Sequence, residues 1–308
     1  MDIRRLPASQ GLAWLQQAIE LGTKNPKAVL GAAMLLIATL YAAVLVMALV
    51  LSLLVGGEPR TGQTPDMRML ILVALAMTLL IIFLVPILLG GLMHVVREAE
   101  AGRPVRAVDL FAPLRSERGQ GLAWLGLVQV VLAVVGGGLV VALAGTDYWQ
   151  DYMKAVNVVL QGGTPVMAGP QHPGLLFVVQ MLFNYFSYAL LLFSIPLMLF
   201  SGCGLIEALK AALQAAVRNA AADLLVGVLF LGAVLIAGLV VMLVSGLVGL
   251  LGSLLHPVIG SLLAAVVMMG FAVMVLVLVA GIAYLAWRDT FGDGAAPAVP
   301  PPPHQFEA

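Results

Sequence analysis

The densest group of polar side chains within an apolar stretch is "QMLFNYFSYALLLFSIP", which lies in the fourth long apolar run of the chain. Gln180, Asn184, Ser187 and Ser194 recur at spacings that place them on one face of a helix, with Tyr188 beside them. Such side chains commonly form hydrogen bonds between membrane helices, each contributing about 0.6 kcal/mol. Alternatively, the same face lines a path for a polar substrate.

A second group of residues that could take part in chemistry begins at the end of the second apolar run, in "HVVREAEAGRPVRAVDLF". His94, Arg97, Glu98 and Asp109 would form an enzyme site only if they converged on one pocket. His94 and Glu98 alone do not make a zinc site, which needs at least three convergent ligands. The sequence also has no nucleophile elbow, phosphate loop or HExxH motif. We therefore expect no cofactor, no metal and no catalytic residues.

The elements that position these residues follow from the composition, which is 62% hydrophobic and 10% charged, with a mean hydropathy of +1.09. These values predict an all-α integral membrane protein with six transmembrane helices, because the apolar runs are too long for barrel strands. A cytoplasmic N-terminal segment with an amphipathic interfacial helix (1–27) precedes the membrane domain (28–291), and a Pro-rich tail (292–308) is expected to be disordered. The six expected spans are Ala28–Val55, Met69–Val95, Gly121–Ala144, Gly174–Ser201, Leu224–Leu251 and Val258–Trp287.

The basic residues predict the orientation of these spans. Twelve lie on one side of the predicted topology and three on the other, which makes the first side cytoplasmic and places both termini there. The three on the outer side are Arg60, Arg68 and Lys154. The expected spans contain no Asp, Glu, Lys or Arg, which argues against an ion-coupled pump.

A short motif recurs before two of the spans. "LQQAIELGTKNPKAVL" (15–30) and "LKAALQAAVRNAAADL" (209–224) each contain an amphipathic helix, a cation and an asparagine, followed by a span. We expect the cation to lie at the lipid headgroups and the asparagine to cap the following helix. A weaker version precedes the third span, with a surface helix expected from about Ala107. The chain would then consist of three parallel repeats, each a cytoplasmic surface helix plus a two-span hairpin.

These basic segments predict binding partners. We expect membrane lipids with anionic headgroups on the cytoplasmic side, with a membrane-protein partner as a further possibility. Nucleic acid is not expected, because acidic residues nearly balance the basic ones in the central loop. The candidate headgroup or partner contacts are Lys24, Asn25, Arg97, Arg103, Arg106, Arg115, Arg118, Arg218 and Asn219.

The outer loop between the third and fourth spans contains "TDYWQDYMKAVNVVL". Tyr148, Trp149 and Tyr152 are typical of an aromatic belt that anchors a short helix on the membrane surface. A platform for sugar binding is the alternative.

Three segments resemble a bacterial family of uncharacterised multi-pass inner-membrane proteins, a domain of unknown function allied to the YciC-like membrane proteins. They are "GLAWLQQAIELGTKNP", "PILLGGLMHVVREAEAGRPVRAVDLFAPL", and "AALQAAVRN" together with the closing "AYLAWRDTF". The resemblance covers both ends and the centre of the chain, and implies a six-span bacterial inner-membrane protein with no assigned reaction.

Together these features predict a non-enzymatic protein with a structural or regulatory role that binds lipids or membrane partners. The main alternative is an uncoupled permease or lipid-handling channel that uses the polar face of the fourth span. A membrane enzyme with a site on the cytoplasmic face is the third possibility.

Overall fold

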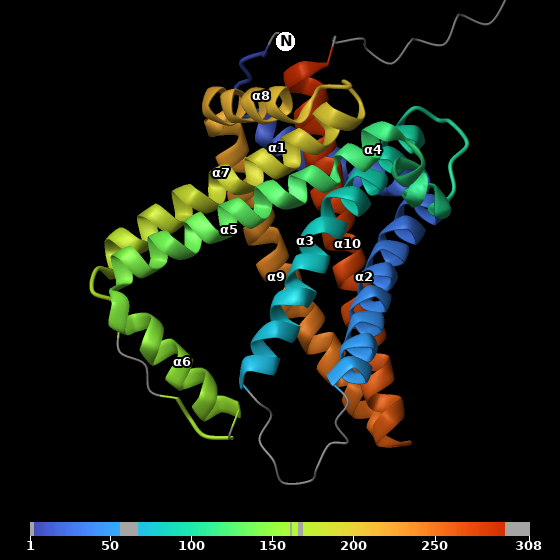
Figure 1. Ribbon diagram of the computed structural model, residues 1–308. Coiled ribbons are helices and arrows are strands. Elements are labelled where there is room, and N and C mark those ends of the chain that lie inside the picture. The colour runs from blue at the N-terminus through green and yellow to red at the C-terminus, as the bar shows by residue number, and fades with distance from the viewer. Residues whose placement is uncertain (1–2, 56–66, 161, 166–168, 293–308) are drawn as a thin grey trace, which may run out of the picture.

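The computed structural model describes residues 3–55, 67–160, 162–165 and 169–292, and these residues form helices and connecting segments without any strand. Arg60, predicted on the outer side, lies outside the described residues. So does the tail that is predicted to be disordered, except for its first residue, Gly292. The elements, drawn in Figure 1, are α1 (Gln10–Lys24), α2 (Pro26–Val55), α3 (Met67–Glu100), the 3-10 helix η1 (Ala107–Arg115), α4 (Glu117–Gly121), α5 (Ala123–Ala144), α6 (Thr146–Leu160), α7 (Pro173–Leu199), α8 (Leu205–Arg218), α9 (Ala220–Ser253) and α10 (Pro257–Phe291).

Six helical segments in the described part of the chain are long and apolar enough to cross a membrane. They are Pro26–Val50, Ile71–Glu100, Glu117–Ala144, Pro173–Leu199, Ala220–Ser253 and Pro257–Phe291. Each contains one of the predicted apolar runs or most of it, so the prediction of an all-α multi-pass membrane protein is confirmed. Several helices extend past the apolar runs and take in charged residues, because a charged side chain near a helix end does not stop the backbone hydrogen bonding. Asp223, Arg288 and Asp289 are therefore helical.

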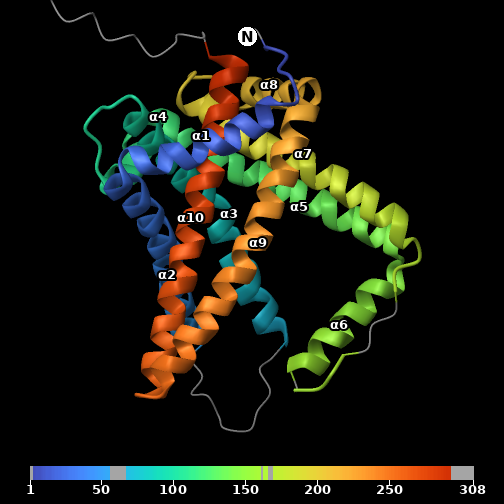
Figure 2. The same cartoon turned by 180° about the vertical axis from the view of Figure 1, so that it is seen from behind.

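Both ends of the described chain lie on the same face of the bundle, as an even number of spans requires (Figures 1 and 2). Helices α1, η1, α4 and α8 lie on or near this face, which we call the termini face. Helices α2, α3, α9 and α10 run away from it. The α5–α7 hairpin splays to one side instead, and α6 extends from its far end.

The packed core lies near the termini face. Trp14, Leu92, Leu110, Ile195 and Leu285 are among its fully buried side chains, and they come from elements spread over the whole sequence. Farther from this face, the spans expose leucine, valine and methionine side chains. A surface of this kind suits hydrocarbon, since lipid tails are as apolar as these side chains.

Two close backbone approaches hold the termini-face elements against the spans. A Cβ atom on Gly91 of α3 would lie 1.8 Å from the carbonyl oxygen of Leu110 in η1. A Cβ on Gly11 of α1 would lie 2.4 Å from the carbonyl oxygen of Ala222 in α9. Only glycine permits these separations.

The surface helices occur in the predicted order. Helix α1 precedes the α2–α3 hairpin and α8 precedes α9–α10. Helix α8 buries a face of alanines, whereas the buried face of α1 also includes Trp14 and Leu21. The predicted helix at Ala107 also forms, but as a nine-residue 3-10 helix that contains Pro113. The middle hairpin differs further, because it carries α6. The order of elements matches three helix-plus-hairpin units, while the threefold repeat itself stays a prediction.

The helix predicted in the outer loop is α6. Its Trp149 and Tyr152 rings stack with centroids 5.6 Å apart, and both side chains are exposed. The aromatic belt and the sugar platform stay alternative predictions for this helix.

Candidate functional site

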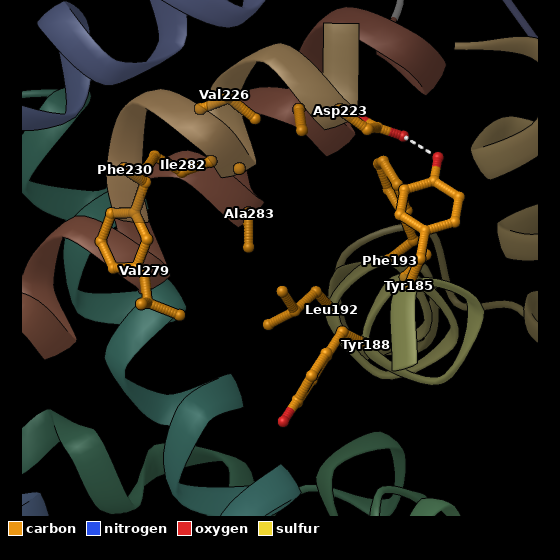
Figure 3. Close-up of a pocket in the computed structure, with 13 residues that line it drawn as sticks. Tyr185, Tyr188, Leu192, Phe193, Asp223, Val226, Phe230, Val279, Ile282 and Ala283 are labelled. Carbon is orange, nitrogen blue, oxygen red and sulfur yellow. Dashed lines mark hydrogen bonds between the residues drawn. The ribbon is translucent and has the colours of Figure 1, made fainter. Parts of the chain in front are cut away.

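An apolar cavity of about 280 Å³ lies between three spans, α7, α9 and α10 (Figure 3). This volume falls just below the range of about 300–1,000 Å³ that is usual for small-molecule sites. Figure 3 shows aliphatic and aromatic side chains from the three helices around one open space. The lining residues are Tyr185, Tyr188, Ala189, Leu192 and Phe193 of α7, Asp223, Val226, Gly227 and Phe230 of α9, and Val279, Ile282, Ala283 and Ala286 of α10.

Two polar groups of the cavity, the Tyr185 hydroxyl and the Asp223 carboxylate, lie at the end where α7 meets the start of α9, whereas the Tyr188 hydroxyl lies away from them (Figure 3). The Tyr185 hydroxyl lies 2.8 Å from the carbonyl oxygen of Ala216 and 3.4 Å from Oδ2 of Asp223. A hydroxyl has one proton to donate, and the shorter distance favours the carbonyl. The Asp223 carboxylate therefore keeps most of its capacity to accept hydrogen bonds. Within the described residues, none of the ion pairs includes Asp223.

The position of Asp223 follows from local structure. It lies in the first turn of α9, where the unpaired N–H groups and the helix dipole stabilise a negative charge. The sequence analysis does not identify Asp223, because the predicted apolar run begins one residue later, at Leu224. An acidic residue directly before an apolar run, together with a tyrosine in another span, was the available signal.

The predicted polar face of α7 does not line this cavity, except for Tyr188. Gln180 donates from Nε2 to Oδ1 of Asn184 at 3.1 Å, within the same helix. The hydroxyls of Ser187 and Ser194 are buried and have no hydrogen-bond partner in the described part of the chain. The expected hydrogen bonds from this face to other helices are therefore absent among the described residues.

Helical geometry explains the separation. Residues advance by about 100° around a helix axis. Tyr185, Ala189 and Leu192 therefore point about 120–180° away from Gln180 and about 80–140° away from Asn184. Gln180, Asn184, Ser187 and Ser194 do not line the cavity, and the role of the polar face as a substrate path stays a prediction.

The two recurring asparagines have different partners. Asn25 accepts a hydrogen bond from the backbone N–H of Ala28 at 3.3 Å, so the predicted cap of α2 is confirmed. Asn219 is 1% exposed and its side chain makes no capping bond to α9, so that part of the prediction is wrong. Instead, its Oδ1 accepts from the Leu6 N–H at 2.9 Å and its Nδ2 donates to the Arg4 carbonyl at 3.0 Å.

Asn219 does not cap α9 because the N-terminal segment covers it and takes up its side-chain hydrogen bonds. Residues 3–9 do not form regular structure, and their buried backbone groups need partners from elsewhere. The Asn219 amide supplies both a donor and an acceptor. It holds the N-terminal segment in place and, because it is buried, does not reach lipid headgroups.

The predicted cationic contacts lie on or near the termini face, and most are exposed. Arg97 is the exception, since its guanidinium lies 4.7 Å from the ring centroid of Phe200. Arg103 forms an ion pair with Glu98, and their hydrogen bond raises the pKa of the Arg103 guanidinium further. The exposed members of the set are Lys24, Arg103, Arg106, Arg115, Arg118 and Arg218.

A network of charged and polar side chains at the end of α10 was not predicted. Arg288 pairs through NH1 with Glu100 of α3, and the Tyr284 hydroxyl donates to the other oxygen of that carboxylate at 2.6 Å. Arg288 also reaches Gln17 of α1, with 3.2 Å between NH2 and Oε1.

Its other half is centred on Asp289. One oxygen of this carboxylate accepts from Gln10 Nε2 at 2.8 Å and from Trp14 Nε1 at 2.9 Å, and the other accepts from Arg288 Nε at 3.0 Å. Helices α1, α3 and α10 are thereby joined at the termini face. The charges are mutually satisfied, which indicates a structural network rather than a binding site.

Three of the four residues of the possible enzyme site have partners of their own. Glu98 pairs with Arg103, Arg97 lies over Phe200, and Asp109 accepts from the backbone N–H of Arg106 at 2.7 Å. Among the described residues, no group of three or more His, Cys, Asp or Glu side chains has an arrangement that could hold a metal ion.

Comparisons with protein-family models, with curated proteins and with solved structures found no match to this chain. The resemblance to YciC-like membrane proteins stays a prediction. We therefore infer the function from the spans, the cationic termini face and the cavity that contains Asp223.

Proposed function

We propose that this chain is a non-enzymatic multi-pass membrane protein that binds lipid, and that a lipid acyl chain enters the cavity between α7, α9 and α10. The observation that carries the proposal is the cavity itself, a space of about 280 Å³ with an almost wholly apolar lining within the spans. Apolar cavities hold apolar guests in preference to water.

Access to the cavity is lateral. Tyr188 is 64% exposed and Gly227 is also exposed, and both line the cavity from helices that are long and apolar enough to span a membrane. In a bilayer, the exposed surface of a span faces hydrocarbon. A guest from the bilayer therefore reaches the cavity without crossing a layer of water.

The termini face supports contact with headgroups. Lys24, Arg106, Arg115, Arg118 and Arg218 are exposed there, and a cation near an anionic membrane surface contributes about 1 kcal/mol. We propose that this face is the cytoplasmic side of a bacterial inner membrane, with both termini cytoplasmic, in agreement with the distribution of basic residues.

The lipid-binding role fits a structural or regulatory protein, with a membrane-protein partner as a further proposal. No observation favours the permease, because Gln180, Asn184, Ser187 and Ser194 of the polar face do not line the cavity. Nor does any favour the enzyme, because Arg97, Glu98 and Asp109 each contact a different partner. Nucleic acid is not proposed as a partner.

Two glycines of α9 offer a matched test. Gly227 lines the cavity and Gly232 does not, and a Cβ at either position meets no atom within 4 Å. Gly227→Leu should place its side chain in or across the cavity, whereas Gly232→Leu adds the same side chain elsewhere on the helix. Neither substitution creates a backbone clash.

The measurement is photo-crosslinking in nanodiscs with a phospholipid that carries a diazirine on its acyl chain. We expect crosslinked peptides from the cavity walls in the unaltered protein and in Gly232→Leu, and a severalfold loss in Gly227→Leu. Crosslinks to the exposed outer surface of α9 serve as the internal reference. Equal cavity labelling in all three proteins would contradict the proposal.

A further inference from the structure

The cavity has an acidic end, formed by Asp223. The ionisable residues among those that line the cavity are Asp223 and two tyrosines, Tyr185 and Tyr188. It lies in the first turn of α9, toward the termini face, while the apolar walls extend away from it along the spans. A lipid with its chain in the cavity therefore brings its headgroup toward this carboxylate.

The carboxylate has unused capacity. Its contact with the Tyr185 hydroxyl is long, at 3.4 Å, and that hydroxyl lies closer to the Ala216 carbonyl. No Lys or Arg of the described chain forms an ion pair with it. A carboxylate that is partly withdrawn from water without a cation gains most from a partner with both positive charge and N–H donors.

The exposed cations of the termini face complement the carboxylate, because they attract the phosphate of a lipid headgroup. Arg218 is exposed and ends α8 immediately before α9 begins. A headgroup with an ammonium and a phosphate presents opposite charges to Asp223 and to the basic termini face. A purely anionic headgroup would place its negative charge near a carboxylate, which is unfavourable.

We propose that Asp223 selects membrane lipids whose headgroup bears a primary ammonium, as in an ethanolamine phospholipid, by accepting its N–H hydrogen bonds at the termini-face end of the cavity. This inference rests on the proposed lipid-binding function and adds the class of headgroup. Tyr185 is a positioning residue, because its hydroxyl joins the end of α8 to the cavity and borders the carboxylate.

The test compares three phospholipids with identical acyl chains in native mass spectrometry of the delipidated full chain. They carry ethanolamine, choline or glycerol headgroups. Choline retains the positive charge but has no N–H donor, and glycerol removes the ammonium. We expect ethanolamine lipid to bind roughly fivefold to tenfold more tightly than glycerol lipid, with choline lipid between them.

Asp223→Asn removes the charge and keeps the shape, and Asp147→Asn removes an exposed charge from α6, away from the cavity, as the matched control. We expect the ratio of ethanolamine to glycerol lipid affinity to approach one in Asp223→Asn and to stay unchanged in Asp147→Asn. Thermal unfolding of both variants checks that they are folded.

The other outcomes separate the two proposals. If Gly227→Leu abolishes binding of all three lipids while Asp223→Asn leaves the headgroup ratio unchanged, the headgroup inference is overturned and the cavity proposal stands. An equal loss of all three lipids in Asp223→Asn would also overturn the headgroup inference, because Asp223 would then support the cavity rather than recognise the ammonium. If binding to the unaltered protein matches that to Gly227→Leu for every lipid, both proposals fail.

Discussion

Gly91→Ala should destabilise the contact between α3 and η1, although alanine is the better helix former. The added Cβ would lie 1.8 Å from the Leu110 carbonyl oxygen, and real Cβ atoms essentially never approach closer than 3.0 Å. The carbonyl would have to withdraw by about 1.2 Å, in a region where the neighbouring residues are fully buried. Overpacking of this kind costs about 1–3 kcal/mol, which exceeds the gain of up to about 1 kcal/mol in helix propensity.

Gly137→Ala in α5 is the matched control, because its Cβ would meet no atom within 4 Å. This variant gains helix propensity without a clash, so its stability should be unchanged or slightly higher. The assay is the apparent Tm in detergent, taken from the fraction of protein that stays monodisperse after heating. A loss of 1 kcal/mol lowers Tm by roughly 2–4 °C in chains of 150–250 residues, so Gly91→Ala should melt several degrees lower.

Hydrogen exchange locates the effect. Amides of η1 should exchange faster in Gly91→Ala, since η1 has to move away from α3, while those of α9 and α10 should change less. A variant that melts at or above the Tm of the unaltered protein, with unchanged exchange in η1, would refute the inference that glycine is required at this contact.

Three further outcomes are expected. Asn219→Ala should lower the free energy of unfolding by about 1–3 kcal/mol and speed amide exchange in the N-terminal segment, because it leaves buried backbone groups without partners. Asn25→Ala removes only a helix cap and should lower it by about 1 kcal/mol. Similar exchange in the two variants would count against this difference. Glu100→Gln should lower the Tm by no more than the equivalent of about 1 kcal/mol, because Arg288 is partly exposed and keeps a second carboxylate partner. The difference in Tm from the unaltered protein should shrink as the NaCl concentration rises. A difference that is independent of salt would show that packing rather than charge is responsible. Burial, followed by the nearby charge of Glu207, raises the pKa of the Cys203 thiol, so at neutral pH less thiolate is present than in a free cysteine. Maleimide labelling of Cys203 should therefore be slow, and its rate should rise about tenfold per pH unit below that pKa. A labelling rate that is already constant above pH 7 would mean that the pKa is low.

The spans could be predicted from sequence because each depends on local information. A run of apolar residues long enough to cross the bilayer identifies itself, and prolines at the first helical position mark the starts of α2, α7 and α10. The surface helices were predicted for the same reason, since their small and apolar residues recur at helical spacing.

The candidate site depends on contacts that local patterns do not contain. Asn25 and Asn219 occupy equivalent positions in similar motifs, yet only the second is covered by the N-terminal segment, from more than 200 residues away. Asp223 was overlooked because it stands one residue before an apolar run, and its relation to Tyr185 appears only when α7 and α9 are packed together. The polar residues of α7 were conspicuous in the sequence, but helical rotation places them away from the cavity.

The network at the end of α10 sets an order for the maturation of the protein during synthesis. Glu100 of α3 and Trp14 of α1 leave the ribosome long before Arg288 and Asp289, which lie 188 and 275 residues later in these pairs. Until α10 is inserted, the Glu100 carboxylate and the Trp14 indole at the termini face lack their native partners. The contacts that join α1 and α3 to the end of α10 can therefore form only after the last helix has been synthesised.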